Sequence, residues 1–232
     1  MIPQIIKVII PAFNEVDSIG KVIHDIPGIV SEVIVVSNAS TDETEARALE
    51  AGATVLHESK KGYGFACLKA MDYIANTQPH PDIVVFIDGD YSDYPEQLEE
   101  IIAPIIDNDL DFVIGARVKA LREAGSMTMP QIFGNWLATS LMRLFFRSKF
   151  TDLGPFRAIK YHKLVDLAME DKTYGWTVEM QLKALRRKYT YTEVPVKYRN
   201  RIGVSKVSGT VKGAIFAGIK ILSWIFKYSF KK

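Results

Sequence analysis

The first half of the chain alternates short apolar runs with longer stretches of helical pattern. Five runs rich in β-branched residues are nearly continuous in apolar character, at residues 5–10, 32–37, 53–58, 82–88 and 111–116. Runs of this kind are typical of parallel strands that are buried on both faces. The intervening helical stretches cover residues 15–26, 41–51, 64–77 and 95–108. This alternation predicts βαβ units, a mostly parallel Rossmann-like α/β sheet and helices on both of its faces.

The second half is less regular. Its pattern indicates helices at 131–146 and 177–188, a short strand or turn at 154–160, and a strand with period-2 alternation at 189–198. The chain contains no internal repeat, low-complexity tract or linker. We therefore predict a single domain with a C-terminal addition. Its expected parts are a domain over 1–208, divided into halves 1–116 and 117–208, and an amphipathic helix over 209–232.

The C-terminal stretch, 209–232, is strongly apolar but is interrupted by Lys212, Lys220 and Lys227. A membrane span needs about 20 mostly apolar residues, so the pattern argues against a transmembrane helix. Aromatic residues such as Trp224, flanked by lysines, suit a helix that lies in a membrane interface. A final helix packed on the domain with its lysines outward gives the same amphipathic pattern. Both interpretations remain open.

Composition sets broad limits on the class of protein. With 232 residues, 48% apolar and 24% charged, the chain matches an ordinary globular protein of one large domain or two small ones. Its one cysteine, Cys67, excludes an internal disulfide and favours a reducing compartment. The N-terminus lacks a basic leader followed by a long apolar stretch, so no signal peptide is predicted.

Charge is distributed very unevenly along the chain. Residues 1–110 contain 6 Lys and Arg against 19 Asp and Glu, whereas residues 111–232 contain 23 against 8. No acidic residue follows Glu193. A basic second half suggests contact with anions such as phosphates or an anionic membrane face. Alternatively, the basic residues only solubilise a helical half. A nucleic-acid binder is disfavoured because no nucleic-acid-binding module is recognisable.

Polar clusters follow the first four predicted strands. They read PAFNE at 11–15, SNASTDE at 37–43, KKGYG at 60–64 and DGDYSD at 88–93. The carboxyl ends of parallel strands meet at one edge of an open sheet, and ligands bind in the crevice there. Each cluster alone is weak evidence, because polar turns after strands are common. Four in register predict a binding site.

The chemistry of these clusters fits a nucleotide diphosphate. Asp88 and Asp90 offer carboxylate oxygens to a hard divalent cation, which completes its shell with water and phosphate. Gly89 lets the backbone bend close to a ligand. The alternative is a solvated acidic turn in which Asp93 only caps the next helix. Neither a nicotinamide fingerprint nor a GxxxxGK[ST] loop is present, and hydrolase and zinc patterns are unsupported.

These residues together resemble family 2 glycosyltransferases with the A-type nucleotide-sugar fold, and within them the dolichyl-phosphate mannose synthases and their bacterial and archaeal relatives. The resemblance runs from IPAFNE to YRNRIGVSKVSG, at 198–209. It implies that the nucleotide-sugar is bound by Pro11, Ala12, Asn14, Glu15, Asn38, Lys61, Gly62, Asp88 and Gly89. Family members usually carry an aspartate pair where this chain has Ser37 and Asn38, and Asn38 can still hydrogen-bond a base.

The resemblance also implies a metal site and catalytic groups. Asp88 and Asp90 match the DxD-type motif, with Asp90 in direct contact with Mg²⁺ or Mn²⁺. The relatives have a metal-holding glutamine at the position of Ser92, which is a shorter ligand. The implied catalytic residues are Asp90, Glu179, Arg117 and Arg201.

Basic segments of the second half resemble the acceptor side of these enzymes. They assign Arg157, Arg199 and Lys206 to an acceptor phosphate, although each could instead be a surface charge. A hydroxyl acceptor requires a general base, for which Glu179 or Asp152 is the candidate. A phosphate monoester is already ionised and needs none.

The implied activity is metal-dependent, inverting transfer of a sugar from a UDP- or GDP-sugar to a polyprenyl or dolichyl phosphate. The enzyme is expected to be peripheral on the cytoplasmic membrane face. Two alternatives remain. One is a soluble glycosyltransferase acting on a hydroxyl of a glycan or glycolipid, and the other is a non-catalytic protein that binds a nucleotide or a membrane.

Overall fold

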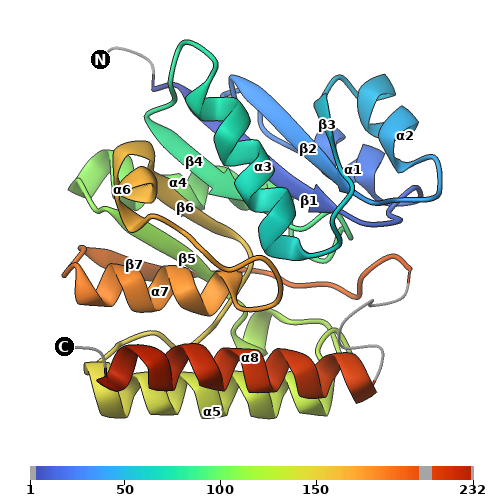
Figure 1. Cartoon of the computed structure of the whole chain (residues 1–232). Coiled ribbons are helices and arrows are strands. Elements are labelled where there is room, and N and C mark those ends of the chain that lie inside the picture. Colours follow the sequence, from blue (N-terminus) through green and yellow to red (C-terminus); the bar gives the residue numbers. More distant parts are fainter. Residues whose placement is uncertain (1–3, 204–210, 231–232) are drawn as a thin grey trace.

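A computed structural model describes residues 4–203 and 211–230 and contains one seven-stranded sheet (Figure 1). The strands are β1 (Ile6–Ala12), β2 (Glu32–Asn38), β3 (Thr54–Glu58), β4 (Ile83–Phe86), β5 (Phe112–Ala116), β6 (Arg157–Lys160) and β7 (Tyr191–Pro195). Their order is β3-β2-β1-β4-β6-β5-β7. All neighbouring strands are parallel except at β6, which runs antiparallel to β4 and β5. The predicted mostly parallel α/β sheet is confirmed.

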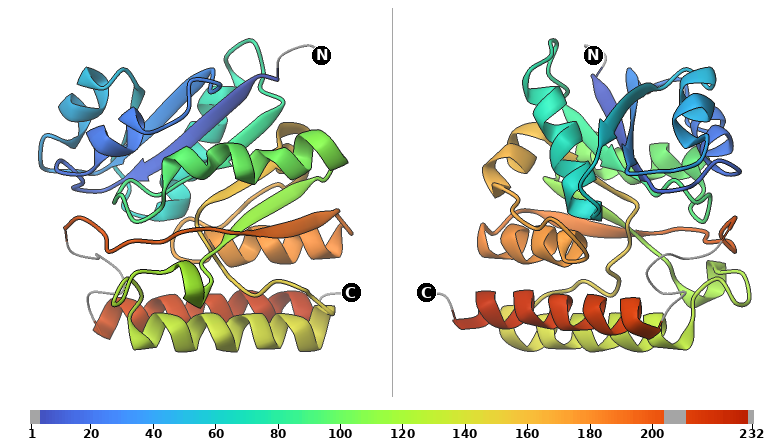
Figure 2. Two further views of the ribbon diagram at one scale, coloured as in Figure 1. Left: turned by 180° about the vertical axis from the view of Figure 1, so that it is seen from behind. Right: turned by 45° about the vertical axis from the view of Figure 1, so that its right-hand side comes forward.

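Helices cover both faces of the sheet, as predicted. One face carries α1 (Ile19–His24), α2 (Thr44–Glu50) and α4 (Leu98–Asn108), which Figure 2 shows from behind. The other face carries α3 (Tyr63–Ala75), α6 (Tyr161–Leu167) and α7 (Trp176–Arg186). Two short 3-10 turns, Pro95–Gln97 and Lys119–Leu121, follow β4 and β5. The central strands are largely apolar because both of their faces are covered; all seven residues of β1, Lys7 among them, are buried.

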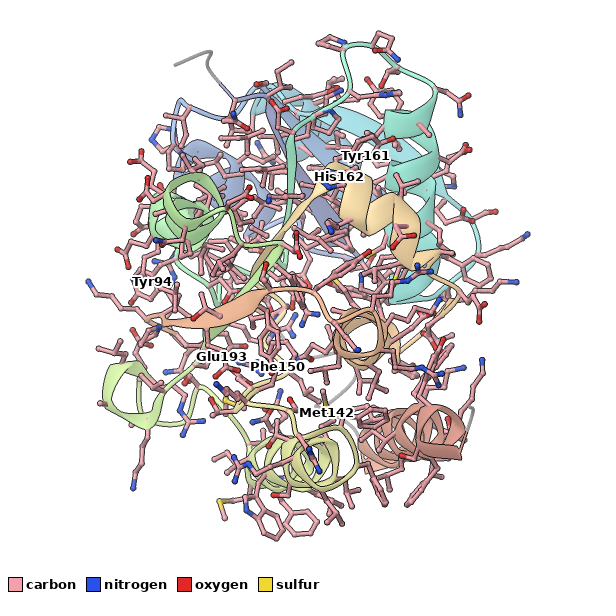
Figure 3. The ribbon with its side chains drawn as sticks, turned by 90° about the vertical axis from the view of Figure 1, so that its left-hand side faces the viewer. Tyr94, Met142, Phe150, Tyr161, His162 and Glu193 are labelled. Carbon is pink, nitrogen blue, oxygen red and sulfur yellow. The ribbon has the colours of Figure 1, made fainter. Side chains whose placement is uncertain are left out.

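Two long helices, α5 (Met129–Phe146) and α8 (Val211–Phe230), lie side by side as a further layer beyond α7 (Figures 1 and 2). A capping box formed by Thr128 and Gln131 begins α5. Met142 of α5 is fully buried and faces the region of Phe150 (Figure 3), whose ring stacks on Tyr191 of β7 at 4.1 Å between centroids. Apolar packing of Met142 in the same cluster as Phe150 and Tyr191 therefore holds α5 against the rest of the domain.

The C-terminal helix α8 packs on the domain through one side. Trp224 and Ile225 are buried, and the indole Nε1 of Trp224 donates to Asp171 Oδ2 at 2.6 Å. Phe216 and Ile219, on another side of α8, are 52% and 59% exposed. The packed arrangement thus leaves a second, apolar side available. Among the described helices, none has the length and hydropathy needed to cross a bilayer.

One feature of the sheet was not expected. β6 comes from the predicted second half but lies between β4 and β5, which belong to the predicted first half. Both halves therefore contribute to one continuous sheet. The assignment of 1–116 to the nucleotide and of 117–208 to the acceptor remains a prediction.

Candidate active site

A cavity of about 530 Å³ lies at the carboxyl ends of β1, β2 and β4, and α5 and α8 contribute to its wall. This is the edge at which an open parallel sheet binds ligands. Most of the residues predicted to bind the nucleotide-sugar and several of those predicted to be catalytic line it: Pro11, Ala12, Glu15, Asn38, Lys61, Gly62, Asp88, Gly89, Asp90, Arg117 and Arg201. The four polar clusters that follow strands in the sequence thus meet in space.

Sharp turns aim these clusters at the cavity. Asn14, Ala39 and Tyr91, just beyond the ends of β1, β2 and β4, have left-handed backbone conformations with φ of 55°, 57° and 62°. Such values are uncommon outside glycine and often occur near functional sites. Tyr91 is held in place because its hydroxyl donates to Asp25 Oδ2 at 2.5 Å.

Asp88 is an incompletely satisfied acidic group on the cavity wall. Its Oδ1 is buried and has no hydrogen-bond partner among the described residues. Burial and, after it, the negative charge of Asp90 together raise the pKa of Asp88 to about 6. A buried carboxylate without a partner is unfavourable, so this position favours a bound cation.

Asp90 is oriented by hydrogen bonds from Ser92, and its charge is neutralised by Arg201. Ser92 donates to Asp90 Oδ1 through its hydroxyl at 2.6 Å and through its backbone N–H at 3.0 Å. Arg201 Nη1 lies 3.1 Å from Asp90 Oδ2, and its Nη2 donates to Glu15 Oε1 at 2.9 Å. Ser92 is buried and does not line the cavity, so it positions Asp90 and is not placed as the metal ligand that we predicted.

The donor atoms of this site fit Mg²⁺ or Mn²⁺. Asp88 and Asp90 supply carboxylate oxygens, and the guanidinium of Arg201 shows that positive charge is accommodated there. Among the described residues, no group of three or more His, Cys, Asp or Glu side chains could enclose a metal. A cation held here would therefore share its shell with water and phosphate oxygens, as Mg²⁺ commonly does.

Asn38 fixes the loop between β3 and α3 at one end of the cavity. Its Oδ1 accepts from the Gly62 N–H at 2.7 Å, and its Nδ2 donates to the Lys60 carbonyl at 2.6 Å. The ammonium of Lys61 lies over the Phe13 ring at 5.0 Å. Both ends of the Asn38 amide are thus engaged by the protein, so the predicted contact with a base is not the role that this geometry favours.

Asn14 has a similar role outside the cavity wall. Its Oδ1 accepts from the Thr41 N–H at 2.8 Å, and its own N–H donates to Ser40 Oγ at 3.1 Å. Asn14 therefore joins the loops after β1 and β2. It was predicted to bind the nucleotide-sugar, but it does not line the cavity.

Two glycines allow the loop that contains Asp171 and Lys172 to cross the start of α3. A Cβ on Gly62 would lie 2.2 Å from the Lys172 carbonyl oxygen, and one on Gly64 would lie 2.0 Å from that of Asp171. Only glycine permits this approach. A Cβ on Gly89, by contrast, would make ordinary contacts of 3.4–3.5 Å, so the fold itself does not require glycine there.

Glu179 does not reach the cavity, contrary to its predicted catalytic role. It is fully buried, and its carboxylate accepts from the N–H groups of Glu170 and Asp171, each at 2.8 Å. Lys183 Nζ lies 2.8 Å from Glu179 Oε1. Its contacts identify Glu179 as the anchor of the loop that crosses α3, not as a base.

The predicted acceptor residues are also placed elsewhere. Arg157 is fully buried and donates to three backbone carbonyls, and desolvation lowers its pKa to about 10. The guanidinium of Arg199 lies 3.3 Å from the ring centroid of Tyr91 and 4.2 Å from that of Tyr94. Neither arginine lines the cavity. Lys206 lies outside the described residues.

Arg117, at the end of β5, forms a two-pronged ion pair. Its Nε and Nη2 donate to the two carboxylate oxygens of Asp152 at 2.8 and 2.7 Å. Burial alone would raise the pKa of Asp152, but the charge and hydrogen bonds of Arg117 hold it below its usual range. Asp152 is therefore an ionised partner of Arg117 and is not free to act as a general base.

Sequence reasoning missed the aromatic side of the cavity. Phe13, Tyr63, Trp176 and Tyr198 all line it. The Tyr63 hydroxyl and the Trp176 indole N–H have no partner among the described residues. Phe13 and Tyr63 lie inside the polar clusters after β1 and β3, so their position after a strand end was the available signal.

Comparison with known proteins identifies the family. A model of the family described as Glycosyl transferase family 2 matches residues 7–166. An uncharacterized glycosyltransferase of Mycobacterium tuberculosis is 32% identical over 215 residues, which cover 91% of this chain and 94% of that protein. The undecaprenyl-phosphate mannosyltransferase of Micrococcus luteus is 30% identical over 231 residues, with 93% and 92% covered.

The fold is shared with a solved enzyme. Glucosyl-3-phosphoglycerate synthase from Mycobacterium tuberculosis, crystallised with Mn²⁺, UDP-glucose and phosphoglyceric acid, superposes with a TM-score of 0.78. At 21% identity the match covers 97% of this chain and 80% of that one, and it shows a common fold. The predicted A-type nucleotide-sugar fold is thereby confirmed, and the chain belongs to glycosyl transferase family 2.

Proposed function

We propose that this glycosyltransferase moves a sugar from a UDP- or GDP-sugar to a polyprenyl- or dolichyl-type lipid phosphate, with inversion at the sugar carbon. The observation that carries the proposal is the Asp88–Asp90 pair on the cavity wall, where one carboxylate oxygen is buried without a partner. The Micrococcus luteus relative is named for a lipid-phosphate acceptor, undecaprenyl phosphate, and its similarity extends over almost the whole chain.

On the donor side, Asp88 and Asp90 would hold Mg²⁺ or Mn²⁺. The bound cation would supply charge neutralisation for the departing nucleoside diphosphate. Arg201, which now pairs with Asp90 and Glu15, is close enough to turn to the diphosphate once a cation satisfies the carboxylates. Lys61, at the nucleotide side of the same cavity, adds a second positive charge.

On the acceptor side, the site lacks an available general base. Of the described carboxylates that line the cavity, Asp88 and Asp90 would hold the cation, and Glu15 is paired with Arg201. Of those nearby, Asp152 is paired with Arg117, and Asp93 and Glu179 are buried and do not line the cavity. A phosphate monoester is already ionised, so its oxygen can attack the anomeric carbon unaided. The new carbon–oxygen bond forms as the bond to the diphosphate breaks, and the diphosphate leaves with the electron pair. The geometry thus favours a phosphate acceptor over a hydroxyl.

The helix pair α5 and α8 provides a surface suited to a membrane. Neither helix contains an Asp or Glu. Large apolar side chains are exposed along both helices: Met129, Ile132, Phe133, Trp136, Leu144, Phe145, Phe216, Ile219 and Phe226. The rings of Phe145 and Phe226 meet edge to face at 6.1 Å, which joins the two helices into one face. Exposed aromatic residues with basic neighbours are typical of helices at an anionic bilayer surface, here proposed to be the cytoplasmic face.

A donor and acceptor panel tests the activity. The full chain is incubated with UDP- and GDP-sugars and a polyprenyl phosphate, with Mn²⁺ or with EDTA. We expect a glycolipid in Mn²⁺ only, and none from Asp90→Asn. A sugar phosphodiester is cleaved by mild acid whereas a glycoside is not, so acid treatment separates the phosphate acceptor from the hydroxyl alternative. Absence of any glycolipid across the panel would overturn the proposal.

Vesicle flotation tests the membrane contact. We expect the protein to float with anionic vesicles, and Phe133→Ser and Phe216→Ser each to weaken binding severalfold, because each removes buried apolar area in the bilayer. Leu49→Ser, which changes an exposed apolar residue on α2, is the matched control. Equal binding by all three variants would contradict this placement.

A further inference from the structure

A second cavity of about 300 Å³ adjoins the larger one. It lies between the segment that follows β5 and the side of α5. Arg117, Met127 and Asn135 line both cavities, so the two communicate at these residues. Its size falls at the lower end of the range for ligand cavities, which is enough for a small anionic group and the start of a chain.

The smaller cavity is positively charged. Its charged lining residues are Arg117, Arg122, Arg143 and Asp152, three cations against one anion. Asp152 neutralises Arg117 through the two-pronged pair described above. In the described part of the chain, neither Arg122 nor Arg143 has an acidic partner within ion-pair distance. Arg122 Nη1 donates to Met127 Sδ at 2.8 Å. The excess of two positive charges matches a phosphate monoester at neutral pH.

Hydrogen bonds hold one wall of this cavity in place. Asn135 of α5 donates through Nδ2 to the Thr151 carbonyl at 3.0 Å and accepts at Oδ1 from the Leu153 N–H at 2.8 Å. These bonds tie α5 to the segment that carries Asp152. The Arg117–Asp152 pair and the backbone of α5 are therefore held in place before a ligand arrives, whereas the side chain of Arg143 is exposed and has to come to rest on the ligand.

An apolar path leads from this cavity to the exposed face of α5. Ile132 and Trp136 line the cavity and are 37% and 60% exposed. The Trp136 ring lies 5.8 Å from that of Phe133, which is itself 60% exposed. A ligand with its anionic end at the arginines would thus have apolar side chains along its way out to the surface proposed to meet the membrane.

We propose that the smaller cavity binds the phosphate and the first isoprene units of the lipid acceptor, with Arg122 and Arg143 as its phosphate ligands. This inference rests on the proposed function and adds the place at which its acceptor is held. It replaces Arg157 and Arg199, whose guanidinium groups are already engaged by backbone carbonyls. Arg117, at the junction of the cavities, would border both the acceptor phosphate and the donor.

The test compares Arg122→Gln and Arg143→Gln with Arg147→Gln. Arg147 is an exposed arginine at the end of the same helix that lines neither cavity, so it controls for the loss of one positive charge near a membrane. Calorimetry measures binding of a ten-carbon prenyl phosphate without donor, and steady-state kinetics gives KM for a long polyprenyl phosphate. Thermal stability and nucleotide binding are measured for each variant.

We expect each of the two cavity variants to weaken prenyl phosphate binding and to raise the acceptor KM about tenfold, because a charge-assisted hydrogen bond is lost. Nucleotide binding and stability should stay at the wild-type level, and Arg147→Gln should match the wild type in all assays. If both cavity variants bind and use prenyl phosphate as Arg147→Gln does, the proposed acceptor cavity is wrong while the transferase activity stands. If the wild type neither binds nor glycosylates a prenyl phosphate, the proposed function fails and this inference falls with it.

A second variant separates the chain from the phosphate. Trp136→Ala should raise the KM for a long polyprenyl phosphate more than that for the ten-carbon compound, since it removes part of the apolar path. An equal change for both lengths would place the chain elsewhere.

Discussion

The buried Oδ1 of Asp88, which has no hydrogen-bond partner among the described residues, predicts that the protein without metal is destabilised at its active site. The pKa of Asp88 is raised to about 6, chiefly by burial and then by Asp90. A rise from about 4 to about 6 corresponds to about 3 kcal/mol against the ionised form. The nearby charge of Arg201 already moderates this effect. We expect Asp88→Asn to raise the free energy of unfolding by about 1–3 kcal/mol at neutral pH in the absence of metal.

The dependence on pH follows from the direction of the shift. Because the pKa of Asp88 is higher in the folded protein than in the unfolded chain, the folded state binds more protons between about pH 4 and pH 6. Wild-type stability therefore falls as the pH rises through this window and stays level above it. The asparagine variant lacks this loss. The excess of its free energy of unfolding over that of the wild type should be small near pH 4.5 and greatest above about pH 6.5.

Urea unfolding with EDTA at several pH values measures this difference. Asp107→Asn, which removes an exposed charge from α4, is the control and should show no such gap. Added Mn²⁺ should stabilise the wild type in proportion to its binding but leave Asp88→Asn unchanged. The reasoning is refuted if Asp88→Asn is less stable than the wild type at pH 7.5 in EDTA, or if the gap is the same near pH 4.5.

Four further substitutions, one of them a control, test the surroundings of the site. Gly64→Ala places a Cβ 2.0 Å from the Asp171 carbonyl oxygen and should lower the free energy of unfolding by about 2 kcal/mol or more. As the control, Gly134→Ala adds a Cβ that meets nothing within 4 Å and should raise the free energy of unfolding by about 0.5–1 kcal/mol. Urea unfolding compares the two variants. Arg201→Gln should tighten Mn²⁺ binding in the absence of nucleotide about fivefold, because it removes a partly exposed ion pair with Asp90 that is worth about 1 kcal/mol. The same variant should slow sugar transfer. Calorimetry measures the first effect and steady-state kinetics the second. Trp224→Phe removes the 2.6 Å bond to buried Asp171 and should lower stability by about 2 kcal/mol, with faster hydrogen exchange in the loop over α3; unchanged values would contradict it.

The sequence by itself determined the sheet and the location of the site. Runs such as 82–88 are typical of strands buried on both faces, because their apolar character is nearly continuous. Parallel strands bring their carboxyl ends to one edge, so Glu15, Asn38 and Asp88 had to approach one another once the strands were recognised. The helix boundaries were less accurate: the helix predicted from residue 15 begins at Ile19, after a turn.

The tertiary structure alone decided which charged side chains serve the site. The sequence gives Arg117, Arg157 and Arg199 the same chemistry, but their partners come from distant segments that the local pattern does not specify. Arg157 is enclosed by carbonyls, while Arg117 stands between two cavities. Arg201 meets Glu15 across 186 positions of the chain. A residue's role follows from burial and from its partners, and both are products of long-range packing that periodicity does not encode.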